Sequence, residues 1–184
     1  MSVNIQLEWT PNPSTLKYVV DRALLPRGAI NFTTVAAAEE RSPLASRLMT
    51  IEGVTGVMIG TNFVTVTKGD AGEWDVLNDT VMSTLDEHLT AELPVVVGDI
   101  ASGHTLGADN SVEQQIRDIL DAEIRPAVMQ DGGDITLDRY EGGIAYVHMR
   151  GSCAGCPSST ATLKMGIEGR LREAIPELIE VVAV

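Results

Sequence analysis

Gly151-Ser152-Cys153-Ala154-Gly155-Cys156-Pro157 holds both cysteines of the 184-residue chain. The apolar run before it, Ile144–Met149, predicts a β-strand, and Pro157 suits the first turn of a helix, where a missing N–H costs nothing. Cys156 would then lie at or beside the helix N-cap, where backbone N–H groups and the helix dipole favour a thiolate. The flanking glycines are expected to expose both thiols. We therefore predict a soft-metal or redox site formed by Cys153 and Cys156.

The residues around this stretch predict an α-β-β-α-β domain over residues 111–184. Ser111-Val112-Glu113-Gln114 has the pattern of a capping box and opens a run of apolar residues at helical spacing. Pro126 should kink this helix or end its regular part near Arg125. Asp131-Gly132-Gly133-Asp134 should end it, with a glycine in the left-handed conformation. The other predicted elements are a hairpin of Ile135–Tyr140 and Ile144–Met149 around Gly142-Gly143, a helix from Pro157 to about Ala174, and a strand at Val181-Val182.

The N-terminal half predicts another small α+β domain, over residues 1–97. The rigid turn Thr10-Pro11-Asn12-Pro13-Ser14 separates a strand at Val3–Glu8, expected to be half-buried, from a strand at Thr15–Val20. Asp75–Glu92 carries four leucine or valine residues on one stripe, which predicts an amphipathic helix of about five turns. Residues 98–110, with three glycines, predict a flexible linker between the two domains. Further elements are expected at Ala29–Thr33 (strand), Pro43–Ile51 (helix), Val54–Ile59 with Phe63–Thr67 (hairpin), and Val95–Val97 (a last strand or an extended tail).

The composition indicates globular domains with aliphatic cores, because 44% of the residues are hydrophobic but only 4% are aromatic. A net charge of −13 without a basic patch makes nucleic acid or an anionic membrane an unsuitable partner. No apolar run approaches the ~20 residues that span a bilayer, and the first residues show no leader pattern. Two cysteines without an export signal favour a reducing, cytoplasmic location and working thiols.

Four interpretations of the cysteine pair compete on the residues alone. A 4Fe–4S cluster needs four thiolates, which two chains meeting at a two-fold axis would supply. A mononuclear zinc site would need two further ligands, and His88, His104 and His148 are poor candidates: the first two lie far along the chain, and the third is expected to be a half-buried strand residue. A thioredoxin-like dithiol shares the strand, the C-x-x-C and the helix, but that fold continues with two strands, whereas one is predicted here. Two buried structural cysteines are the fourth interpretation, against which the exposing turn argues.

Four motifs follow one another in the second half: Ile124-Arg125-Pro126-Ala127, Asp131-Gly132-Gly133-Asp134, the cysteine stretch Gly151–Ser159, and Thr162-Leu163-Lys164-Met165-Gly166-Ile167-Glu168. In this order and spacing they resemble the Nfu domain, the C-terminal module of NifU-type iron–sulfur scaffold and carrier proteins, over about residues 111–180. The first half is similar to the Nfu N-terminal domain, over a shorter match, through Ile5-Gln6 and the segment Thr10–Tyr18.

The resemblance implies that Cys153 and Cys156 ligate a labile iron–sulfur cluster shared by two chains. The type 4Fe–4S is favoured over 2Fe–2S, and the sequence leaves both open. It implies a scaffold or carrier and not an enzyme. Its partners would be an upstream cluster-assembly scaffold, apo iron–sulfur proteins as acceptors, and a second copy of the chain when the cluster is bound. The acids of Asp131–Asp134 could then shape the cluster rim, besides stopping a helix. A thiol–disulfide oxidoreductase using the same cysteines is the alternative function.

Overall fold

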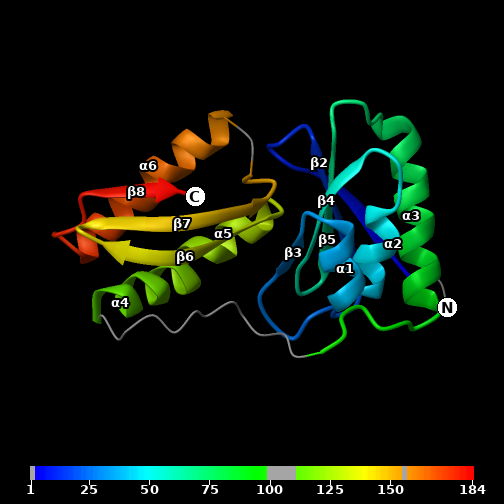
Figure 1. The fold of residues 1–184 in the computed structure, drawn as a ribbon, viewed down its shortest axis with the longest axis horizontal. Helices are drawn as coiled ribbons and strands as arrows, with labels where there is room; N and C mark the ends of the chain where they lie inside the picture. Colours follow the sequence, from blue (N-terminus) through cyan, green and yellow to red (C-terminus); the bar gives the residue numbers. More distant parts are fainter. Residues whose placement is uncertain (1–2, 99–110, 155–156) are drawn as a thin grey trace. The chain divides into compact units, whose positions relative to one another are not determined.

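The computed structural model describes residues 3–98, 111–154 and 157–184, and the chain divides into two compact units, Met1–Ser102 and Gly103–Val184. Both units combine helices and strands, which confirms the predicted α+β class (Figure 1). Apart from Gly98, the predicted linker lies outside the described residues, and the exact domain bounds stay a prediction. Among the described residues, none of the helices combines the length and the apolar character needed to cross a bilayer.

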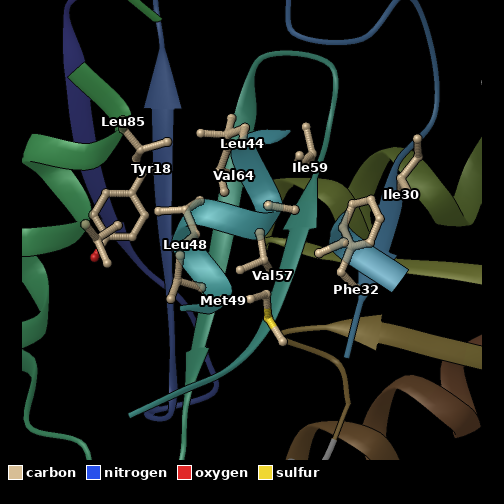
Figure 2. Close-up of a cluster of buried hydrophobic side chains, with 14 of the residues drawn as sticks. Tyr18, Ile30, Phe32, Leu44, Leu48, Met49, Val57, Ile59, Val64 and Leu85 are labelled. Atoms are coloured by element: carbon tan, nitrogen blue, oxygen red, sulfur yellow. The ribbon is translucent and has the colours of Figure 1, made fainter. Parts of the chain in front are cut away.

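The first unit is a five-stranded antiparallel sheet with helices packed on it. The strands lie in the order β1-β2-β5-β4-β3. Alternate strand residues such as Tyr18, Val57 and Val64 meet Leu48 and Leu85 of the helices in one buried cluster (Figure 2). The elements are β1 (Ile5–Trp9), β2 (Thr15–Val20), β3 (Ile30–Phe32), α1 (Val35–Arg41), α2 (Pro43–Met49), β4 (Val54–Ile59), β5 (Phe63–Lys68) and α3 (Trp74–Thr90).

Most of these elements match the predicted ones, and two features differ. The predicted stripe of α3 is confirmed, because Leu77, Val81, Leu85 and Leu89 are all buried. Helix α1 escaped prediction because it buries only Ala38, so it shows no apolar periodicity; Thr34, whose hydroxyl accepts from the Ala37 N–H, was the available sequence signal. Strand β1 is mostly exposed rather than half-buried, because it is an edge strand of the sheet.

Residues 95–97 form no strand, so the first of the two predicted options is wrong, and they follow α3 as a tail. The Ser42 hydroxyl donates to the Val95 carbonyl at 2.6 Å, and the Val97 N–H donates to the Arg41 carbonyl at 2.8 Å. The ring of His88, fully buried at the end of α3, lies with Nε2 3.0 Å from the Pro94 carbonyl oxygen. Because a carbonyl can only accept, Nε2 carries the proton. These three contacts fasten residues 94–97 to the rest of the first unit.

This histidine should make the first unit less stable in mild acid. Burial lowers the pKa of His88 from its ordinary 6.5, against the raising effect of the Pro94 carbonyl, and the Arg47 cation lowers it further. The unfolded chain then binds more protons, so the stabilisation is complete above about pH 6.5 and is lost as pH falls towards the folded pKa. The free energy of unfolding can be measured with urea and tryptophan fluorescence at pH 7.5 and at pH 5.5. Between these two pH values, the His88→Gln protein should lose less stability than the wild type. Equal losses would contradict this role.

The second unit is a three-stranded sheet of order β6-β7-β8, in which β6 and β7 are antiparallel and β7 and β8 are parallel. Its helices and its sheet share one buried cluster, to which Ile116, Ile135, Val147, Ile167 and Val181 contribute. The predicted α-β-β-α-β order is confirmed. The elements are α4 (Ser111–Ile119), the π-helix η1 (Leu120–Ile124), α5 (Arg125–Gln130), β6 (Gly133–Glu141), β7 (Ile144–Gly151), α6 (Pro157–Ala174) and β8 (Glu180–Ala183).

Pro126 has the predicted effect on the first helix of this unit. A wider π-turn precedes it, and the Arg125 N–H bonds to the Leu120 carbonyl, five residues back, which leaves room for the proline ring. The helix ends at Gln130, and Gly132 takes the left-handed conformation with φ 77°, as expected. The capping box differs from its prediction: Ser111 is itself the first helical residue, and the Gln114 amide donates to Asp118.

Candidate functional site

Cys153 lies in a turn that follows directly from the end of β7. Two hydrogen bonds from Ser152 fasten this turn to the loop between α5 and β6: the Ser152 N–H donates to the Gly132 carbonyl at 3.1 Å, and its hydroxyl donates to the Asp131 carbonyl. The Ala154 N–H donates to the Gly151 carbonyl at 3.1 Å, and this hydrogen bond closes the turn. The backbone that carries Cys153 is therefore positioned by residues 131–132, some twenty positions earlier in the chain.

The Cys153 side chain is buried, which corrects the expectation that the glycines expose it. It is 6% exposed and belongs to the apolar cluster of the second unit. The sulfur lies against Gly133: a Cβ placed there would be 2.3 Å from the Cys153 Sγ, so the sulfur fills the space that a side chain would take. Cys156 lies outside the described residues; the helix that follows it begins at Pro157, as predicted.

A buried ion pair supports the loop beside Cys153. Asp134 is 1% exposed, and both of its carboxylate oxygens accept from Arg125, from Nε at 2.8 Å and from Nη2 at 3.2 Å. The third guanidinium nitrogen donates to Asp121 at 2.9 Å. Arg125 therefore joins the helical segment around the π-turn to the first residues of β6, next to Gly133.

The ion pair keeps Arg125 charged despite its partial burial. Burial acts to lower the pKa of Arg125, but the hydrogen bonds and charges of Asp134 and Asp121 outweigh it, so that the pKa lies above its ordinary value. The Asp134 carboxylate thus faces a permanent cation. This makes Asp134 a structural residue; the side chain of Asp131, by contrast, is exposed.

The described histidines do not join Cys153. His148 stands half-exposed on β7, with Nε2 3.2 Å from Asp138 and Nδ1 3.1 Å from the Val184 carbonyl, which agrees with its prediction. His88 is buried in the first unit, and His104 lies outside the described residues. In the part of the chain that the structure describes, no three His, Cys, Asp or Glu side chains gather in a way that could hold a metal ion.

The sequence motifs include Cys153, Arg125 and the Asp131–Asp134 loop, but they do not predict the contacts between these residues. The contacts of Gly133 with the thiol, of Ser152 with the loop, and of Arg125 with Asp134 all link residues that no local periodicity relates. The succession of the motifs was the only available signal.

Comparison with known proteins identifies the family. The family model for the NifU-like domain matches residues 116–182, and the model for the N terminus of the scaffold protein Nfu/NifU matches residues 5–92. A human protein named NFU1 iron-sulfur cluster scaffold homolog, mitochondrial, is 40% identical over 176 residues, which cover 95% of this chain and 69% of the human protein. A Drosophila willistoni protein of the same name is 38% identical over 177 residues, 95% of this chain and 61% of its own.

The chain therefore belongs to the Nfu/NifU family of scaffold proteins, as its motifs suggested, and a member of this family is not an enzyme. It spans 61–69% of the length of these two relatives. A solution structure of a NifU-like protein from Saccharomyces cerevisiae aligns with 53% of this chain and 87% of its own, at 21% identity and a TM-score of 0.48. This structural similarity adds nothing to the family assignment.

Proposed function

We propose that the protein is an iron–sulfur cluster scaffold or carrier that holds a labile cluster through Cys153 and Cys156 and passes it to apo-proteins. The cluster is the cargo, 4Fe–4S rather than 2Fe–2S, and two copies of the chain share it. The observation that carries this proposal is the position of Cys153. It sits in a fastened turn between a strand and the N-terminus of α6, with the C-x-x-C spacing, in a chain of the scaffold family.

The cysteine count and the start of α6 support a shared anionic cargo. One chain offers two thiolates, whereas a 4Fe–4S cluster takes four. An isologous contact between two chains presents the same surface twice and so brings four thiolates together. Four thiolates around the core leave a net charge of about −2, which helix N-termini favour. Each chain would bring the N-terminus of its own α6 to this charge.

Transfer would proceed by ligand exchange. A thiolate of the acceptor attacks an iron, an iron–sulfur bond to Cys153 or Cys156 breaks, and the released thiolate takes up a proton; no electron changes hands. Repetition at each ligand moves the whole cluster. A site shared by two chains can release the cluster one ligand at a time, and a carrier needs this stepwise release. Apo iron–sulfur proteins are the proposed acceptors, an upstream cluster-assembly scaffold is the proposed source, and the proposed compartment is the cytoplasm, although the relatives above are named mitochondrial.

Anaerobic reconstitution tests this function directly. The loaded protein should be brown and should contain about four irons and four sulfides per two chains, with the mass of a dimer. Removal of the cluster should favour monomers. A colourless protein that takes up no iron would refute the proposal and favour the thiol–disulfide oxidoreductase. Four irons on a monomer without added small thiols would refute the shared site.

We also propose the division into a first domain of residues 1–97, a linker of 98–110 and a cluster-binding domain of 111–184. A fragment of residues 109–184 should fold alone and bind the cluster as the whole chain does, because the second unit has its own buried core and its cysteine turn is fastened within it. Circular dichroism and iron content would check this. An unfolded fragment beside a folded full-length chain would contradict the division.

A further inference from the structure

We propose that Gly133 is a positioning residue for Cys153. It leaves a notch that holds the Cys153 thiol inward while no cluster is bound, and the thiol leaves this notch to ligate iron. The inference rests on the proposed function in one respect, since it takes Cys153 as a cluster ligand. The inward position itself is independent of that role.

The notch is defined by distances around Gly133. A Cβ at this position would meet the Cys153 Sγ at 2.3 Å, the Cys153 Cβ at 3.2 Å and the Arg150 carbonyl oxygen at 3.2 Å. Real Cβ atoms essentially never approach another heavy atom as closely as the first distance. The sulfur therefore occupies the volume of the missing side chain and packs as a small hydrophobic group in the cluster of the second unit.

Of the contacts that a side chain at residue 133 would make, the one with the Cys153 thiol is the closest, and the Arg150 carbonyl oxygen follows at 3.2 Å. Gly133 opens strand β6 and is not among the glycines with positive φ, so its backbone does not require glycine. Gly166 and Gly169 in α6 offer the contrast, because a Cβ at either would meet nothing within 4 Å. Gly133 thus differs from these two helical glycines in its contact with the thiol.

The inward thiol must move before it can bridge two chains. Iron shared with a second chain has to lie at the surface of the first, whereas Cys153 is buried against Gly133. Ser152 fastens the turn through its N–H and hydroxyl, so rotation of the Cys153 side chain is the smallest movement that brings the sulfur outward. Any stabilisation of the inward position favours the cluster-free state and weakens cluster binding to the same degree. The notch would therefore assist release.

Alkylation of a single thiol tests the notch without any cluster. In the Cys156→Ser background, Cys153 is the only cysteine of the chain, and its rate of reaction with iodoacetamide reports its accessibility. Adding Gly133→Ala should raise this rate about ten-fold, because the new methyl group drives the thiol outward. Gly166→Ala in the same background is the matched control and should leave the rate unchanged. An unchanged or slower reaction in the Gly133→Ala protein would overturn the proposal.

A second pair of variants keeps the test valid if Gly133→Ala is unstable. The drop in melting temperature that Gly133→Ala causes should largely disappear when Cys153 is Ala, because the closest contact is with the sulfur. If the double variant were as unstable as the single one, the clash would lie with the Arg150 carbonyl and the notch would not hold the thiol.

Loaded protein separates this inference from the proposed function. Gly133→Ala protein should load normally but lose its cluster to an iron chelator several-fold more slowly than wild type, because its cluster-free state has lost the inward position. A wild type that takes up no iron, beside the expected alkylation rates, would refute the proposed function and leave the notch standing. Normal loading with unchanged alkylation and release would refute only the notch.

Discussion

Serine in place of Cys153 or of Cys156 is expected to abolish stable cluster binding. Each substitution removes two of the four thiolates from a shared site, one from each chain, and a serine hydroxyl is a weaker iron ligand than a thiol because it is far harder to deprotonate. The reconstituted variants should retain less than about a tenth of the wild-type iron and sulfide. Metal and sulfide analysis together with visible absorption would measure the loss.

Met165→Ser is a suitable control for these variants, because Met165 on α6 is 76% exposed and its sulfur atom has no assigned role. It should load as the wild type does. A wild-type cluster content in either cysteine variant would show that the corresponding residue is not a ligand.

Arg125→Ala should destabilise the second unit by about 3–5 kcal/mol, because it leaves the buried Asp134 carboxylate without its bidentate partner. Arg125→Lys should cost less than the alanine variant, since it keeps the charge but loses the two-pronged contact. Urea unfolding of the full chain followed by circular dichroism would record the loss.

The chain offers two controls for this measurement. Arg170 makes the same two-pronged contact with Glu123, at 2.5 and 2.8 Å, but both side chains are exposed, so Arg170→Ala should change the stability far less. Both tryptophans, Trp9 and Trp74, lie in the first unit, and their fluorescence should show an unchanged unfolding transition in the Arg125→Ala protein. If Arg125→Ala and Arg170→Ala lowered the free energy of unfolding equally, the burial of Asp134 would not contribute to the strength of its ion pair.

Local patterns predicted most of the secondary structure because the apolar residues carry the period of their element. The stripe of α3, the hairpin of β6 and β7, and the start of α6 at Pro157 were all visible in the sequence. Helix α1 was not, because it buries a single alanine. The burial of β1 was overestimated because alternation cannot distinguish an edge strand from a central one.

The candidate site was predicted by residue type but not by geometry. The C-x-x-C spacing pointed to Cys153, yet the direction of its side chain depends on Gly133, twenty positions earlier, and no local rule connects the two. The role of Asp134 could not be predicted from the sequence either. Its turn motif indicated part of a helix stop, and only the contact with Arg125 in the structure reveals a buried ion pair.

The parallel pairing of β7 with β8 has a consequence for how the molecule comes to be made. Ile144 pairs with Glu180, so the strand that leads into the cysteine turn gains this neighbour only after all of α6 has been synthesised. Contacts so distant in the chain form late, because closing the loop between them costs entropy that nearby contacts do not. During translation, the cysteines would leave the ribosome before the strand that completes their sheet. The sheet beside the cysteine turn would thus be completed only after the turn itself has left the ribosome.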